Sequence, residues 1–133
     1  MGTFSVIQWL DRDLHIYQIT VPESLDTVEQ RAAFLDELYE FIMPGPDGQY
    51  ALVDMTRFKG RLVGLTDPKL SRQRNTEIKT RAVAVLTSST SAQIIVNTIR
   101  ALFFNKLPWR FFRDRAEAEA FLREYAQRDL GLS

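Results

Sequence analysis

Short apolar runs that alternate with longer amphipathic stretches are the feature of this chain that most restricts its fold. Five of the runs are rich in β-branched and aromatic residues, the composition typical of strands. They cover residues 4–10, 14–21, 50–55, 81–86 and 109–112. Strands that alternate with helices of ten or more residues indicate parallel crossover units, in which helices cover a sheet. We therefore predict an α/β layered fold of order ββαβαβαβα, with a mostly parallel sheet of about five strands.

The first two runs are expected to pair as a hairpin. Asp11, Arg12 and Asp13 form the polar break between them, which is short enough for a hairpin turn. Pro22 cannot donate a hydrogen bond to a sheet, so the second strand ends before it. The first strand is then an antiparallel edge of the sheet. His15 falls inside the second predicted strand without a nearby nucleophile, and we interpret it as a structural or surface residue.

Four helical segments follow the later strands. Asp26 and Glu29 have the spacing of a capping box at the start of the first segment, and Asp114 and Glu117 repeat that spacing at the start of the last. The other two cover residues 67–79, a basic and poorly amphipathic stretch, and residues 92–105, an apolar one. The core-facing positions expected from helical periodicity are Val28, Ala32, Leu35, Tyr39 and Ile42 in the first helix and Ala118, Phe121, Leu122 and Tyr125 in the last.

Composition excludes several classes of function. The chain has 133 residues, the size of one domain, with no cysteine and one histidine. Disulfides, thiolate metal sites, cysteine catalysis and multi-histidine metal sites are therefore absent. We find no cofactor motif, no secretory leader and no apolar run long enough to span a membrane. The expectation is a single soluble, cytoplasmic domain that is not an enzyme and holds no metal or cofactor.

Charge is unevenly distributed along the chain although the formal net charge is zero. Residues 1–58 carry ten acidic and three basic side chains, whereas residues 59–81 carry seven basic and two acidic ones. One interpretation is that the basic segment, with Arg72 and Arg74, meets an acidic partner protein. The other is a solvated helix that faces the acidic first helix of its own chain. Nucleic-acid binding is not expected, because the domain is not basic overall and carries no matching motif.

Three local patterns resemble the SpoIIAA-like branch of the STAS superfamily (sulfate transporter and anti-sigma-factor antagonist domains). They are residues 52–60 (LVDMTRFKG), 81–85 (RAVAV) and 109–122 (WRFFRDRAEAEAFL). The resemblance covers nearly the whole chain and implies a non-catalytic regulatory domain that works through protein partners. Antagonist members carry a phosphorylated serine in an Asp-Ser-Ser-Gly stretch, which this chain lacks. The resemblance also implies a distant relation to CRAL-TRIO lipid carriers, so a carrier or sensor of a small apolar or amphipathic ligand is the alternative.

A candidate binding surface follows from the expected topology, because ligands of open parallel sheets bind beyond the carboxyl ends of the strands. At these strand ends the surface would consist of Asp54, Thr56, Thr87, Ser88, Ser89, Thr90 and Arg113. The hydroxyl run precedes a predicted helix, so it would bind a phosphate or other anion or simply cap that helix. Asp54 is the most catalytic-looking acid, with hydrogen bonding to the next loop as the alternative role.

The predicted third helix carries more apolar surface than one helical face buries. Phe103 and Phe104 lie in it, and Leu107, Pro108 and Trp109 follow. This surface would form a homodimer interface or an apolar-ligand pocket, or it would pack deeply against the rest of the chain.

Overall fold

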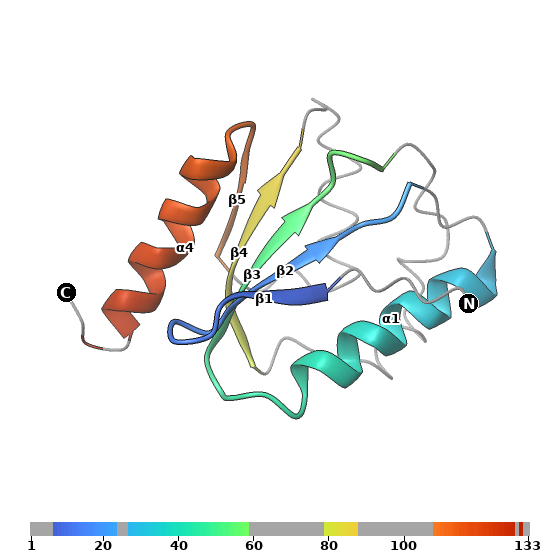
Figure 1. The fold of residues 1–133 in the computed structure, drawn as a ribbon, viewed down its shortest axis with the longest axis horizontal. Helices are drawn as coiled ribbons and strands as arrows, with labels where there is room; N and C mark the ends of the chain where they lie inside the picture. Colours follow the sequence, from blue (N-terminus) through green and yellow to red (C-terminus); the bar gives the residue numbers. More distant parts are fainter. Residues whose placement is uncertain (1–6, 24–26, 59–78, 88–107, 130, 132–133) are drawn as a thin grey trace.

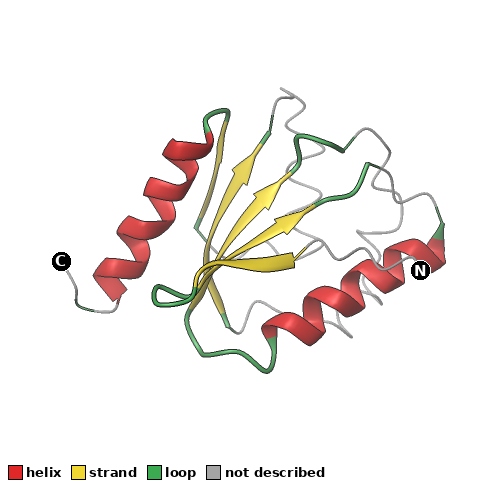
Figure 2. Cartoon of the chain, viewed as in Figure 1, coloured by secondary structure: helices red, strands yellow, loops and turns green. Residues whose placement is uncertain are grey.

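A mixed sheet of five strands, in the order β1-β2-β3-β4-β5, forms the centre of the molecule (Figures 1 and 2). The structure, a computed structural model, describes residues 7–23, 27–58, 79–87, 108–129 and 131. The strands are β1 (Ile7–Asp11), β2 (Ile16–Thr20), β3 (Gln49–Asp54), β4 (Thr80–Leu86) and β5 (Trp109–Phe112). β1 is antiparallel to β2, and every other neighbouring pair is parallel. The predicted α/β class and the antiparallel first edge are thus confirmed.

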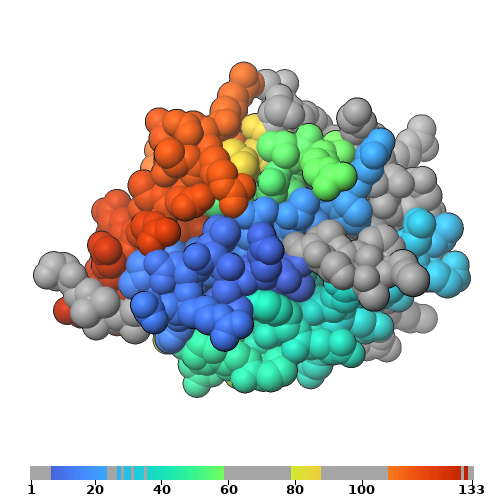
Figure 3. Space-filling model, viewed as in Figure 1, coloured from blue at the N-terminus to red at the C-terminus, as the bar shows by residue number. Residues whose placement is uncertain are grey.

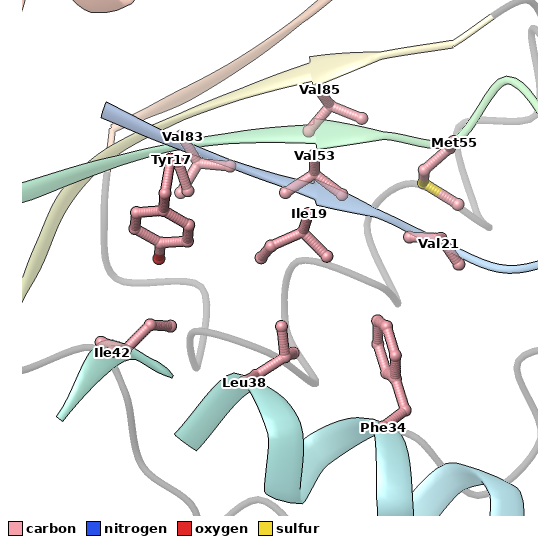
Figure 4. Close-up of a cluster of buried hydrophobic side chains, with 11 residues drawn as sticks. Tyr17, Ile19, Val21, Phe34, Leu38, Ile42, Val53, Met55, Val83 and Val85 are labelled. Carbon is pink, nitrogen blue, oxygen red and sulfur yellow. The ribbon is translucent and has the colours of Figure 1, made fainter. Parts of the chain in front are cut away.

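Two helices of the described part cover opposite faces of the sheet. They are α1 (Val28–Ile42) and α4 (Arg115–Asp129). The helices predicted for residues 67–79 and 92–105 lie outside the described residues, except Lys79, which is a turn residue. The alternation of side chains along the strands divides the core in two. The α1 side buries Tyr17, Ile19, Val21, Phe34, Leu38, Ile42, Ala51, Val53, Met55, Val83 and Val85 (Figure 4). The α4 side buries Leu14, Ile16, Tyr50, Leu52, Ala82, Ala84, Leu86, Ala118, Leu122 and Ala126.

α1 begins one residue later than predicted and turns a different stripe toward the sheet. Thr27 is the N-cap, because its hydroxyl accepts from the backbone N–H of Gln30 and the Gln30 side chain accepts from the Thr27 N–H. Phe34, Leu38 and Ile42, spaced four apart, point into the core (Figure 4). The prediction was wrong for Tyr39, whose relative exposure is 38%. Ala32 is half-buried, and the side chains of Val28 and Leu35 lie outside the described part.

The hairpin between β1 and β2 is confirmed, but His15 lies in its turn rather than in a strand. His15 has φ 60°, the left-handed conformation, which stops the second strand from extending back to residue 14. Its Nδ1–H donates to the carbonyl oxygen of Gly48 at 3.2 Å. The Asp11 carboxylate accepts from the backbone N–H of Leu14 at 3.1 Å. The single histidine therefore stabilises a turn.

The amino ends of the parallel strands are closed by the loop that follows α1. Lys79 Nζ donates to the carbonyl oxygens of Met43 at 2.6 Å and Gly45 at 2.7 Å. A cation beside the last carbonyls of a helix is favourable, because the carboxyl end of the helix dipole is negative. Gln49, the first residue of β3, donates from Nε2 to the Ile42 carbonyl at 2.9 Å. Lys79 therefore contacts its own chain, and both interpretations of the basic segment stay predictions, because residues 59–78 lie outside the described part.

Candidate functional site at the carboxyl edge of the sheet

The carboxyl ends of four strands lie side by side, as the arrowheads of β2, β3 and β4 show in Figure 1. Three backbone hydrogen bonds join these ends across the edge. They run from Val21 N to Asp54 O (2.9 Å), from Met55 N to Leu86 O (2.8 Å) and from Thr87 N to Phe112 O (3.0 Å). Segments distant in sequence therefore meet at one edge. In Figure 3 the green surface of residues in and after β3 and a small yellow patch of β4 lie beside the orange surface of the segment that contains the start of α4.

Asp54 and Thr87 share this edge but face opposite sides of the sheet. Asp54 pairs with Leu86, and Thr87 is the next residue along the chain. Asp54 continues the series of Tyr50 and Leu52 on the α4 side, whereas Thr87 continues the series of buried valines on the α1 side. Thr87 is itself buried, with 3% relative exposure. A ligand at the edge that contacts Asp54 would therefore not meet the Thr87 side chain on the same face.

Asp54 uses both carboxylate oxygens within its own chain. Oδ1 accepts from the backbone N–H of Thr56 at 2.9 Å and from the Thr56 hydroxyl at 2.7 Å. Oδ2 lies 3.9 Å from Nη1 of Arg115, and the Asp54 side chain is 13% exposed. This geometry matches the alternative role, hydrogen bonding to the next loop. A carboxylate held in this way fixes the loop and the neighbouring arginine, and it is not arranged as a general base.

Arg115, which the sequence analysis did not single out, is at the centre of the cluster. Its Nη2 donates to the side-chain oxygen of the buried Gln18, and its Nε donates to Glu119 at 3.0 Å. Gln18 in turn donates to the Thr20 hydroxyl at 2.8 Å. The Arg115 side chain remains 42% exposed. We call these residues the carboxyl-edge cluster: Gln18, Thr20, Asp54, Thr56, Arg115 and Glu119.

The charges continue from this cluster along α4 to the opposite end of the sheet. Glu119 also lies 3.8 Å from Arg123, and Arg123 Nη1 donates to the Asp11 carboxylate at 2.7 Å. Alternating charges thus connect Asp54 to the β1–β2 turn through one face of a helix. Spacings of four residues place Arg115, Glu119 and Arg123 in a row on that face.

The contact between Asp11 and Arg123 predicts a small acid-sensitive contribution to stability. Burial alone would raise the pKa of Asp11, but hydrogen bonds from Arg123 and Leu14, with the charge of Arg123, hold that pKa below its usual value. A lowered folded-state pKa stabilises the fold above the pKa of the unfolded chain, about 4, and the stabilisation disappears as pH falls. Because Arg123 is 41% exposed and screened by solvent, we expect less than about 1 kcal/mol at pH 7.

The measurement compares urea unfolding of the wild type and Asp11→Asn at pH 7 and pH 3. Asparagine can still accept from the Leu14 N–H, so the variant removes mainly the charge. The wild type should be more stable at pH 7, and the difference should shrink at pH 3. Asp13→Asn, in the same exposed turn, is the matched control and should show no such trend. A difference between wild type and Asp11→Asn that is equal at both pH values would contradict the assignment.

The other predicted site residues are only partly covered by the structure. Thr56 and Arg113 are exposed at the carboxyl edge, and within the described part Arg113 makes no ion pair. Arg72, Arg74, Ser88, Ser89 and Thr90 lie outside the described residues, so the basic helix and the anion site stay predictions. No group of three or more histidine, aspartate or glutamate side chains within the described ranges is arranged to hold a metal ion.

Two aromatic residues of β5 are used in packing. Phe112 contacts Phe121 of α4 with ring centroids 5.4 Å apart, and Trp109 packs against the α1-side core. Phe111 is exposed. Phe103 and Phe104 lie outside the described residues. The apolar-ligand pocket and the homodimer interface expected from this region therefore stay predictions.

Comparison with known proteins finds similarity to one solved structure. No family model and no curated protein match the chain. Its structure is similar to that of an uncharacterised protein of the DUF3478 family with a SpoIIAA-like fold from Shewanella loihica PV-4. The identity is 19%, the match covers 80% of this chain and 82% of that chain, and the TM-score is 0.49. No helix among the described residues is long and apolar enough to cross a membrane.

Proposed function

We propose that residues 1–133 form a single non-catalytic, regulatory protein-interaction domain whose partner contacts the carboxyl-edge cluster. One observation carries this proposal: an arginine that is 42% exposed, Arg115, is held in place by Gln18, Asp54 and Glu119. A side chain fixed by several partners loses less freedom on binding than an unrestrained one, which favours recognition. Arg113 is exposed and makes no ion pair within the described ranges, so the partner is expected to place a carboxylate beside it.

The chemistry of the described residues supports binding rather than catalysis. The Asp54 carboxylate accepts a hydrogen bond from its own loop, and the His15 ring donates one to the Gly48 carbonyl. Catalysis by a nucleophile or general base requires such groups to face one another over a bound substrate. The described residues show no such pair. Because the Asp-Ser-Ser-Gly stretch is missing, the proposal includes no phosphorylation switch at that position.

Site-specific photo-crosslinking in cells of the source organism tests the proposal. A benzophenone amino acid replaces Thr56, which is exposed at the carboxyl edge, or Arg12, which is exposed in the turn at the opposite end of β2. We expect a discrete crosslinked partner from position 56 and not from position 12. Arg113→Glu should weaken that crosslink, whereas Arg128→Glu, near the far end of α4, should leave it unchanged. Equal products from both positions, or none from position 56, would refute the proposal.

A further inference from the structure

We propose that the outer edge of β5 binds an extended acidic segment of a partner protein by strand addition. This surface is separate from the carboxyl-edge cluster, and the inference does not depend on the proposed function. Strand addition uses the unpaired backbone groups of an edge strand for affinity and its side chains for specificity. Among the residues that the structure describes, β5 is the last strand in the sheet order and pairs only with β4.

The backbone direction at Phe111 follows from the pairing with β4. Val83 N donates to the Pro108 carbonyl at 3.0 Å, and Thr87 N donates to the Phe112 carbonyl at 3.0 Å. In a parallel ladder, alternate residues direct both backbone groups to the same neighbour. Residues 108, 110 and 112 therefore face β4, and the N–H and C=O of Phe111 face away from it. An added strand would find a donor and an acceptor at that residue.

The side chains of β5 add an apolar contact and positive charge on the two sides of this edge. Phe111 is 54% exposed, an unusual fraction for a phenylalanine in a strand. Arg110 lies on the opposite face, with its guanidinium carbon 5.7 Å from the ring centroid of Phe112. Within the described ranges, neither Arg110 nor Arg113 makes an ion pair. A bound strand would meet a phenyl ring on one face and an arginine on the other.

The charge of the β5 side chains determines whether a second copy of this chain or a segment of another protein binds along this edge. Charged side chains on a short edge strand oppose pairing between identical copies, because like charges across neighbouring strands are destabilising. Two copies of β5 would place the Arg110 side chains of both copies along one seam. A segment with glutamate or aspartate on one face and apolar residues on the other would instead pair its charges with Arg110. The occupant is therefore an acidic, alternating segment of another protein.

Fluorescence anisotropy with defined peptides tests this inference. The probe is a fluorescein-labelled peptide of alternating glutamate and valine, and the control peptide carries lysine in place of each glutamate. We expect the acidic peptide to bind and the basic peptide not to bind. Phe111→Pro removes both the outward N–H and the exposed phenyl ring, so binding should weaken by at least about tenfold, the effect of one hydrogen bond. Arg110→Glu should weaken it at least as much, whereas Arg128→Glu, elsewhere on the surface, should not.

Three results would overturn the inference. They are equal binding of the acidic and basic peptides, unchanged binding by Arg110→Glu, and no binding of the acidic peptide up to about 1 mM. If Phe111→Pro does not fold, Arg110→Glu alone decides the outcome, because its side chain is exposed and outside the core. The crosslink from position 56 reports on the carboxyl-edge cluster, so failure of one proposal is distinguishable from failure of the other.

Discussion

Replacing Phe34 with alanine is expected to lower the free energy of unfolding by about 3–5 kcal/mol. The Phe34 ring has no exposed surface and fills the space between α1 and the sheet, beside Val21 and Met55 (Figure 4). Its removal loses the transfer free energy of the ring and leaves a cavity, because a close-packed core relaxes only in part. That loss is a large share of the 5–15 kcal/mol typical of a small domain.

Urea unfolding followed by circular dichroism measures this effect. Tyr39→Ala is the matched control, because Tyr39 is an aromatic residue of the same helix that is partly exposed. Its substitution is expected to cost much less, about 1 kcal/mol or below. Equal losses in the two variants would mean that α1 presents the stripe first expected from periodicity rather than the one containing Phe34.

Replacing Leu122 with alanine is the second large effect, with an expected loss of about 2–5 kcal/mol. The fully buried side chains of α4 are Ala118, Leu122 and Ala126, and Leu122 is the largest of these. α4 is further attached at its end by a hydrogen bond of 2.6 Å from the Tyr50 hydroxyl to Asp129. Such polar contacts contribute about 1 kcal/mol each, so they do not compensate for the lost leucine.

The same urea experiment checks this variant against Glu124→Ala. The Glu124 side chain is 73% exposed on the same helix, and its substitution is expected to change stability by less than about 0.5 kcal/mol. Because Arg115 begins α4, the Leu122→Ala variant should also weaken the photo-crosslink from position 56. Stability within 0.5 kcal/mol of the wild type would show that α4 does not depend on this contact with the sheet.

The sequence predicted the sheet well because its strands are short apolar runs that lie between turn residues. Residues 50–53, for example, are apolar throughout, which indicates coverage on both sides. The side of α1 that faces the sheet was harder to predict, because the apolar residues of this helix fit two adjacent stripes. Tyr39 belongs to the stripe that the sheet does not contact, and only packing decides between the two. Asp26 was the predicted cap of α1, but the hydrogen bonds identify Thr27, one residue later.

The sequence predicted which edge of the sheet holds the candidate site, but it did not predict Arg115, the central residue of the cluster. The rule for parallel sheets placed Asp54 and Thr56 at the carboxyl ends, where the structure has them. Arg115 was not predicted, because its role depends on Gln18 and Asp54, which are distant from it in sequence. The sequence did contain a signal that could have indicated Arg115. The cap at Asp114 places residue 115 in the first turn of a helix that follows the edge strand. The direction of the side chains, which separates Asp54 from Thr87, follows from the register of the strands.

Amide hydrogen exchange measured by NMR tests most directly whether distant segments meet along the carboxyl edge. The N–H groups of Val21, Met55 and Thr87 each bond to a neighbouring strand end. We expect all three to exchange at least about a hundredfold more slowly than in an unstructured peptide, because exchange requires the edge to open. Exchange of any of the three at the unstructured rate would show that its strand end is not joined to its neighbour, and the proposed partner surface would not exist as described.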